Sequence, residues 1–144
     1  MFKTILAAYD GSEHARKAIE VACDIASTYK ASLHILHTPQ LPGETMMVGY
    51  SAVPLPPSAE ELEKAGNEAI EQARGIAAQH GVDQPETMVR QGDPGRNIVE
   101  YANENDVDLI VMGRRGLGQF GTLLVGSVTH KVSQLADCAV LTVK

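Results

Sequence analysis

Residues 112–129 read MGRRGLGQFGTLLVGSVT, and this stretch decides how the rest of the chain is interpreted. It follows an apolar run, holds five glycines and two adjacent arginines, and leads into the pattern of a last helix. Glycine weakens regular structure, so glycines gathered at one turn are typical of a backbone that approaches something closely. Backbone N–H groups at a strand-to-helix turn suit an anion, of which phosphate is the usual one. We therefore expect an anion-binding loop supported by the rest of the chain.

Length and composition limit the class of protein. The chain has 144 residues, which fits one domain spanning 1–144, and its net charge is −6. An acidic chain lacks the basic surface that sequence-independent nucleic-acid binding needs. No apolar run approaches the roughly 20 residues of a membrane span, and the N-terminus is unlike a signal peptide. Cys23 and Cys138 belong to no paired motif. We expect a cytoplasmic protein that inserts in no membrane and binds no nucleic acid.

Apolar runs alternate with helical patterns along the chain. Alternation of this kind predicts an α/β fold, a parallel sheet with helices on both faces. The expected strands are 3–9, 31–37, 86–91, 107–112 and 138–143. Right-handed crossovers then favour the strand order 3-2-1-4-5, with the ligand site beyond the carboxyl ends of the first and fourth strands. That order brings Asp10 beside Gly113.

Residues 38–57 interrupt this rhythm. They hold five prolines and two glycines outside the strand and helix patterns, together with apolar residues such as Met46, Met47 and Tyr50. A structureless loop of about 20 residues is unusual in a compact domain. We expect a lid, a binding loop or a mobile segment here.

Ser12 or Asp10 can cap the first helix, Ser58 and Glu61 form a capping box that begins the second, and Asp93 with Pro94 begins the third. The apolar stripe of the second helix is Leu62, Ala65, Ala69, Ala73, Ile76 and Ala77.

Two common nucleotide motifs do not account for the glycine stretch. A Walker A motif is absent, because no glycine is followed by lysine anywhere in the chain. Gly116, Gly118 and Gly121 match G-x-G-x-x-G, but they follow the fourth expected strand, whereas a dinucleotide-binding unit places the motif after its first strand. A nicotinamide or flavin site is therefore disfavoured. In the remaining alternative, the glycines only make a tight turn and the arginines are solvated.

The wider spacing is more informative. Gly113, two residues, Gly116, nine residues and then Gly126-Ser127 match the G-2x-G-9x-G-[S/T] motif of the universal stress protein family. The opening ILAAYDGSE, the Gly92-Asp93-Pro94 turn and the final CAVLTVK also resemble that family, in the same order. The resemblance covers essentially the whole chain. It implies a Rossmann-like domain of the branch that binds ATP, with Mg²⁺ as the expected companion.

The resemblance also implies a site, taken position by position. Ala8 contacts the base, Asp10 lies near the ribose or metal, and Thr38 contacts adenine through its backbone. The glycine loop surrounds ribose and phosphates, and the start of the last helix donates to phosphate. The metal ligands stay open, and no catalytic residue is assigned. The complete predicted set is Ala8, Tyr9, Asp10, Thr38, Met112, Gly113, Arg114, Arg115, Gly116, Leu117, Gly118, Gln119, Gly126, Ser127, Val128 and Thr129.

These features favour an ATP-binding regulatory protein in which the nucleotide controls conformation, assembly or partner binding. Its partners would be an adenine nucleotide, a second copy joined through the C-terminal strand, a larger oligomer of such copies, and an unidentified protein. Some members of the family are encoded beside transporters, so a transporter is one candidate partner. The alternatives are a slow ATPase or nucleotide-transfer enzyme, a flavoprotein suggested by the fold alone, and an interaction module without nucleotide.

Overall fold

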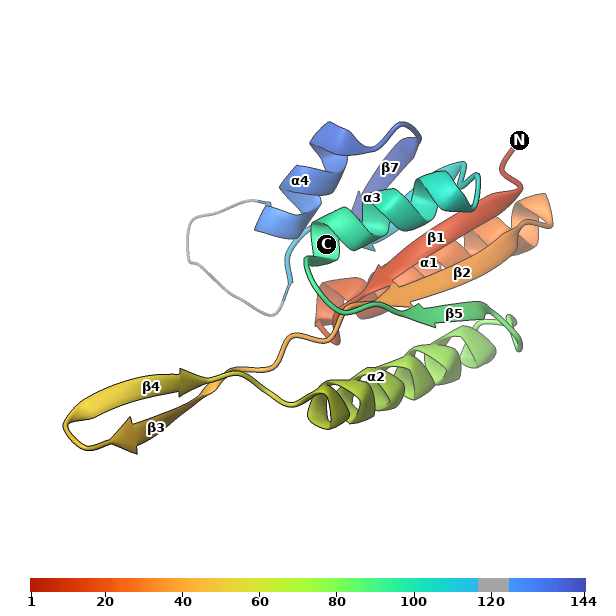
Figure 1. Cartoon of the computed structure of the whole chain (residues 1–144). Coiled ribbons are helices and arrows are strands. Elements are labelled where there is room, and N and C mark those ends of the chain that lie inside the picture. Colours follow the sequence, from red (N-terminus) through yellow and green to blue (C-terminus); the bar gives the residue numbers. More distant parts are fainter. Residues whose placement is uncertain (117–124) are drawn as a thin grey trace.

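A parallel sheet forms the centre of the molecule (Figure 1). The computed structural model describes residues 1–116 and 125–144. The sheet contains β1 (Thr4–Tyr9), β2 (Ser32–His37), β5 (Glu86–Val89), β6 (Leu109–Gly113) and β7 (Ala139–Val143). These strands lie in the order β5-β2-β1-β6-β7 and every adjacent pair is parallel. The predicted α/β class and strand order 3-2-1-4-5 are thereby confirmed. The numbers differ because two further strands, β3 (Glu44–Val48) and β4 (Ser51–Leu55), form a separate hairpin.

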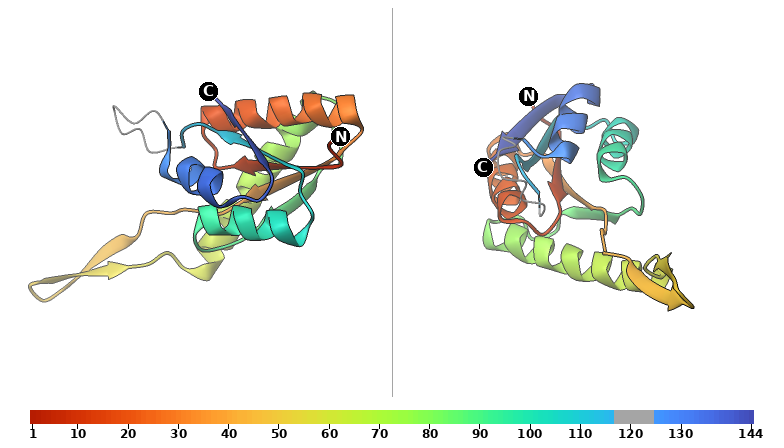
Figure 2. Two further views of the ribbon diagram at one scale, coloured as in Figure 1. Left: turned by 90° about the horizontal axis from the view of Figure 1, so that it is seen from above. Right: turned by 90° about the vertical axis from the view of Figure 1, so that its left-hand side faces the viewer.

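Two helices cover each face of this sheet (Figures 1 and 2). The helices are α1 (Glu13–Tyr29), α2 (Ala59–Gln79), α3 (Pro94–Glu104) and α4 (Ser127–Leu135). α1 and α2 pack on one face, whereas α3 and α4 pack on the other. Across the described residues, no helix combines the length and the apolar content needed to cross a membrane.

The helices begin where their capping residues predict. The Ser12 hydroxyl caps α1, and Ser58 and Glu61 form the reciprocal capping box of α2. Asp93 caps α3, with Pro94 in its first turn. Each cap satisfies backbone N–H groups that have no partner inside the helix, which fixes the starting residue. The three predicted helix starts are therefore confirmed.

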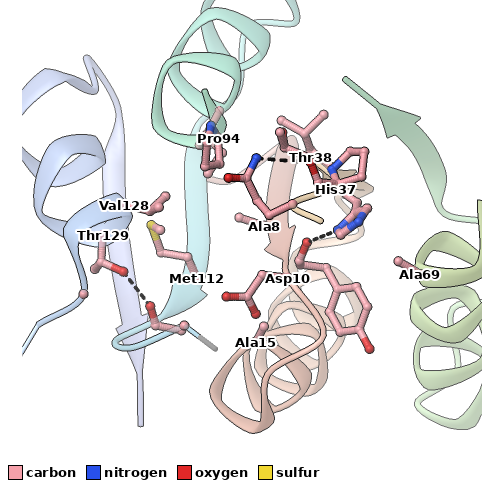
Figure 3. A pocket seen from close by; sticks show the side chains of 18 of the residues that line it. Ala8, Asp10, Ala15, His37, Thr38, Ala69, Pro94, Met112, Val128 and Thr129 are labelled. Atoms are coloured by element: carbon pink, nitrogen blue, oxygen red, sulfur yellow. Dashed lines mark hydrogen bonds between the residues drawn. The ribbon is translucent and has the colours of Figure 1, made fainter. Parts of the chain in front are cut away.

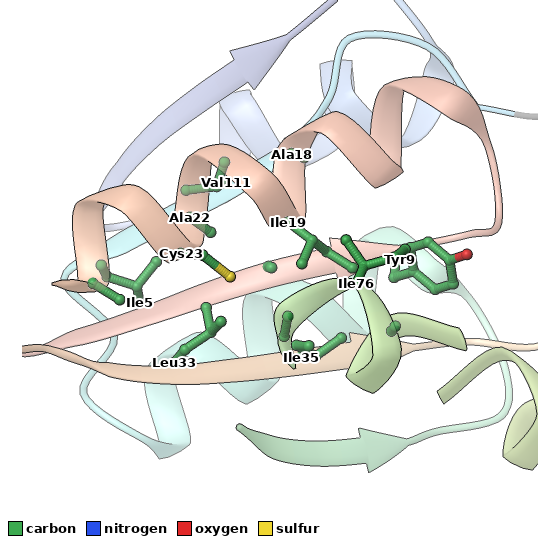
Figure 4. Close-up of a cluster of buried hydrophobic side chains, with 14 of the residues drawn as sticks. Ile5, Tyr9, Ala18, Ile19, Ala22, Cys23, Leu33, Ile35, Ile76 and Val111 are labelled. Carbon is green, nitrogen blue, oxygen red and sulfur yellow. The ribbon is translucent and has the colours of Figure 1, made fainter. Parts of the chain in front are cut away.

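The central strand β1 supplies both hydrophobic cores. Successive side chains of a strand point to opposite faces, so Ile5 and Ala7 pack under α1 and α2 while Leu6 and Ala8 face α3 and α4. Figure 4 shows the first of these clusters, which also contains Cys23. Burial raises the pKa of the Cys23 thiol to about 11, so at neutral pH it is a small apolar group within the core.

The buried stripe of α2 differs from the predicted one in its N-terminal half. The sequence pattern placed Ala65 and Ala69 in the apolar stripe; Gly66 and Ile70 are the fully buried residues there, while Ala69 is partly buried against the same core. A Cβ at Gly66 would lie 2.6 Å from a methyl carbon of Val89, so glycine lets α2 approach β5 closely. Small apolar residues on neighbouring positions gave no way to decide the rotation of this half of the helix. Ala65 and Ala69 both line a cavity.

The segment expected to be a structureless loop contains a β-hairpin. Strands β3 (Glu44–Val48) and β4 (Ser51–Leu55) pair antiparallel around Gly49 and Tyr50, and they extend away from the body (Figures 1 and 2). Gly49 has φ 64°, a conformation that glycine adopts without a steric penalty. The prediction of a structureless loop was wrong because the positions of the prolines, not their number, decide whether strands can form. Four of the five lie outside the two strands, and Pro54 sits where its missing N–H is tolerated.

Candidate nucleotide site

A cavity of about 590 Å³ opens beyond the carboxyl ends of β1, β2 and β6 (Figure 3). β1 lies between β2 and β6, so this is the point where the strand order reverses. Open parallel sheets bind ligands at this point because neighbouring connections leave it toward opposite faces. The volume is within the range of about 300–1,000 Å³ that is typical of small-molecule sites.

The first wall of the cavity comes from the ends of β1 and β2, and its side chains are held by hydrogen bonds. Asp10 Oδ1 accepts from the backbone N–H of Ser12 at 2.9 Å. His37 Nδ1 lies 2.7 Å from the Tyr9 carbonyl oxygen, which only accepts, so this nitrogen carries the proton. Burial, with a smaller contribution from the Asp10 carboxylate, raises the pKa of the Tyr9 hydroxyl. This wall is fixed in place.

Thr38 is held by a residue that the sequence analysis did not identify. The side-chain amide of Asn97, on α3, donates to the Thr38 hydroxyl at 3.0 Å and lies 3.2 and 3.1 Å from the carbonyl oxygens of Arg90 and Gln91. Asn97 is buried, with 8 % of its surface exposed. It therefore ties the end of β2 to the turn after β5. An amide at an inward position of an apolar helix stripe is the signal that would have revealed it.

The second wall of the cavity comes from the glycine stretch and the start of α4. At two of its glycines, an added side chain would collide with α1 or with Asp10. A Cβ at Gly113 would lie 2.8 Å from the Cβ of His14 and 2.9 Å from the backbone nitrogen of Ala15. A Cβ at Gly116 would lie 2.6 Å from Asp10 Oδ2. The predicted convergence of Asp10 with the glycine stretch is present, and glycine is what allows the close approach.

The N-terminus of α4 completes the second wall. Its N-cap residue is Gly126, and no side chain in the described part of the chain caps the helix. Ser127, Val128 and Thr129 follow along the cavity, and the Thr129 hydroxyl anchors the helix by donating to the Gly113 carbonyl at 2.7 Å. Uncapped N–H groups and the positive end of the helix dipole attract anions.

A cation lies beside this helix end. Arg115 lines the cavity, whereas Arg114 does not; the Nε atoms of both arginines are buried without a hydrogen-bond partner among the described residues. The Arg115 backbone N–H donates to His14 Nδ1 at 3.3 Å, which fixes the loop against α1. A buried guanidinium N–H without a partner is costly unless a ligand or solvent supplies an acceptor. The second wall therefore presents donors and positive charge.

Most of the predicted site residues lie around this one cavity. Arg114 does not: it is not among the lining residues, and its backbone N–H donates to the Val143 carbonyl at 2.7 Å, which joins it to β7. The predicted residues Leu117, Gly118 and Gln119 lie outside the described part of the chain. The predicted residues that line the cavity are Ala8, Tyr9, Asp10, Thr38, Met112, Gly113, Arg115, Gly116, Gly126, Ser127, Val128 and Thr129.

The cavity also has an apolar end that the sequence analysis missed. Apolar residues from five separate segments line the cavity, and only the tertiary structure brings them together. Those away from the glycine stretch are Leu36, Pro39, Leu41, Ala65, Ala69, Pro94 and Ile98, whereas Ala15 and Val125 adjoin the glycine stretch. An apolar end and an end with donors and positive charge suit a ligand with a flat apolar ring and an anionic tail. Within the described residues, no three His, Cys, Asp or Glu side chains gather as a metal site.

A parallel α/β sheet with a phosphate-type loop at its switch point defines a class of nucleotide-site folds, and comparison with known proteins gives the family. The model of the universal stress protein family matches residues 1–144. The universal stress protein YxiE of Bacillus subtilis is 38% identical over 149 residues and covers 100% of both chains. A Thermus aquaticus relative, described as the universal stress protein in the QAH/OAS sulfhydrylase 3′ region, is 40% identical over 148 residues with the same coverage.

A solved structure agrees with this assignment. A universal stress protein in complex with cAMP superposes with a TM-score of 0.75 and 26% identity, covering 99% of this chain and 97% of the other. The chain therefore belongs to the universal stress protein family, and the resemblance drawn from the sequence is confirmed.

Proposed function

We propose that this protein binds an adenine nucleotide, ATP with Mg²⁺, as a regulatory ligand in the cavity between β1, β2 and β6. The observation that carries the proposal is the second wall, where the start of α4 with Gly126 as its N-cap and Arg115 line a cavity whose other lining is largely apolar. A structural relative solved with cAMP supports an adenine nucleotide as the ligand class.

The two ends of the cavity assign the two ends of the ligand. The adenine ring would lie against the apolar residues beside Thr38, and the phosphates would lie between Gly116 and the start of α4. Asp10 Oδ2 faces Gly116, so in this proposal the carboxylate would lie near the ribose or the Mg²⁺. A base, a sugar and a charged tail need this combination of surfaces, whereas inorganic phosphate alone would use only one end.

The nucleotide would act by stabilising one conformation rather than as a fuel. Asp10, the carboxylate nearest the glycine loop, already accepts a hydrogen bond from Ser12, which suits a positioning role better than the activation of water. Ligand binding to the folded state would also tie β1, β6 and α4 together. We further propose a cytoplasmic homodimer paired through the edge strand β7, and an unidentified protein partner, for which a transporter is a candidate.

The identity of the bound ligand is the first test. The purified protein is denatured and the released material is chromatographed, and the apo protein is then melted with and without ATP–Mg²⁺. We expect an adenine nucleotide in the released material and a rise in Tm with ATP. The absence of both would overturn the proposal.

A turnover assay separates the regulatory function from the enzymatic alternative. Labelled ATP is incubated with the pure protein, and ADP, AMP and inorganic phosphate are followed over time. We expect turnover well below about 1 per second, the lower end of ordinary enzyme rates. Faster turnover would make the protein an ATPase or a nucleotide-transfer enzyme.

A further inference from the structure

The β3–β4 hairpin forms an arm that exposes apolar side chains on both faces. The arm is defined here as residues 44–55, and each residue in its two strands is exposed. Met47 and Tyr50 illustrate this, with exposed fractions of 64 % and 106 %. An isolated two-stranded hairpin is marginally stable in water and needs further strands or a packed face. We therefore expect the arm to pack against another surface.

The two edges of the arm differ in their capacity to pair. In a hairpin with a two-residue turn, the pair next to the turn, Val48↔Ser51, is hydrogen-bonded, and pairs then alternate along the strands. Thr45↔Pro54 and Met47↔Ala52 are then non-hydrogen-bonded pairs, whose backbone groups point outward. Pro54 has no N–H, so the outer edge of β4 lacks a donor. The outer edge of β3 keeps the donors of Thr45 and Met47.

A second β3 strand matches this open edge. When two copies of β3 pair antiparallel, one register pairs all five residues, with Met46 opposite Met46 of the second copy. Thr45 then lies opposite Met47, and these are the residues with outward backbone groups. Glu44 lies opposite Val48, so the two carboxylates sit at opposite ends of the paired strands. Like charges directly opposite one another would be destabilising, and this register avoids them.

Charge also permits close contact between two arms. The whole protein carries a net charge of −6, but Glu44 is the sole charged residue between positions 38 and 57. Two acidic bodies repel at short range, and arms that hold them apart reduce this repulsion.

We propose that the arm pairs with the arm of a second copy of this chain through β3, forming a four-stranded intermolecular sheet in the order β4-β3-β3-β4. The contact is isologous, because both copies use the same surface, and its twofold axis passes midway between the two Met46 residues. It lies at a different place from the β7 edge and needs no nucleotide. A chain that also pairs through β7 would assemble beyond a dimer.

Proline scanning of the two edges tests this contact. Thr45→Pro removes an outward N–H from the β3 edge without removing a bond inside the hairpin, and Ala52→Pro does the same on the β4 edge. The oligomer mass of the full chain is measured by light scattering after size exclusion, with circular dichroism to verify folding. We expect Thr45→Pro to halve the mass and Ala52→Pro to leave it unchanged. A monomeric wild type, or a folded Thr45→Pro variant of unchanged mass, overturns the proposal.

Cysteine cross-linking tests the same contact without altering the backbone. Met46→Cys and Val53→Cys are cross-strand partners on one face of the arm. In the proposed sheet the two Met46 Cα atoms lie about 4.5 Å apart, close enough for a disulfide, whereas the two Val53 positions are three strand spacings, roughly 14 Å, apart. We expect disulfide-linked dimers from Met46→Cys alone in a Cys138→Ser background. Equal yields from both variants, or no dimer from Met46→Cys, overturns the proposal.

Discussion

The two walls of the cavity are built in opposite ways. The wall from β1 and β2 has its polar side chains already paired, as Asp10 is with Ser12, His37 with Tyr9 and Thr38 with Asn97. The wall from the glycine stretch and α4 presents an uncapped helix start and an arginine Nε without a partner among the described residues. The first wall can select a ligand mainly by shape, since Asp10 Oδ1, His37 and Thr38 already have hydrogen-bond partners. In the proposed function, the second wall would gain hydrogen bonds from an anionic ligand.

Gly116→Val should give the largest effect on binding, because it fills the phosphate end of the second wall. The added carbon collides with Asp10 Oδ2, the far end of a side chain that can move, so the fold should survive. We expect ATP affinity to fall by at least roughly 100-fold, measured by calorimetric titration, with little change in urea unfolding. Gly75→Val, at a position with open space, is the control for a glycine change elsewhere. Wild-type affinity in Gly116→Val would contradict the assignment of this wall.

Gly113→Ala should instead affect stability. Its Cβ would meet the backbone of α1 at Ala15, which cannot move aside cheaply. We expect the free energy of unfolding to fall by about 1–3 kcal/mol, measured by urea denaturation. The matched change Gly75→Ala, in the interior of α2, should raise it by about 0.5–1 kcal/mol. Equal effects of the two changes would mean that β6 and α1 are not in close contact.

Arg115→Ala should weaken binding by about tenfold for ATP and much less for adenosine, because a charge-assisted hydrogen bond to phosphate is lost. The same titrations with both ligands give this ratio, and added salt should reduce it. Arg114→Ala is the matched control, since Arg114 does not line the cavity and should have a smaller effect. A larger effect of Arg114→Ala would exchange the roles of the two arginines.

The smallest effect concerns the ion pair between Asp93, at the start of α3, and Lys131 of α4. Asp93, which caps α3, accepts from Lys131 Nζ on α4 at 2.8 Å, and this hydrogen bond, with that from Arg96 N–H, holds the Asp93 pKa below its usual value. The carboxylate therefore stabilises the folded state above its unfolded pKa of about 3.9, and the contribution is lost as pH falls through the lower folded pKa.

Asp93→Asn measures this contribution. The variant should be slightly less stable than the wild type at pH 7, and the difference should shrink below about pH 4 in urea titrations. Lys131→Gln should show a similar convergence. A difference independent of pH would assign the effect to helix capping alone.

The sequence predicted the alternation of strands and helices, the strand order and three helix starts. Those features depend on local chemistry: apolar runs, the Ser58–Glu61 capping box and the Asp93-Pro94 helix start. The β3–β4 arm escaped prediction because its strands lack alternating polarity, both faces being exposed. The rotation of α2 was also not predicted, because whether Ala65 or Gly66 is buried depends on the contact with Val89 at the end of β5.

By itself, the sequence determined that Asp10 and the glycine stretch meet at the carboxyl edge of a parallel sheet, because strand order and handedness follow from the pattern of elements. Only the tertiary structure decided that Arg115 rather than Arg114 faces the cavity, that Asn97 holds Thr38, and that Ala65 and Ala69 close the apolar end. These outcomes depend on which side of a backbone each residue takes when distant segments pack together. Neighbouring residues of similar chemistry carry no local signal that separates them.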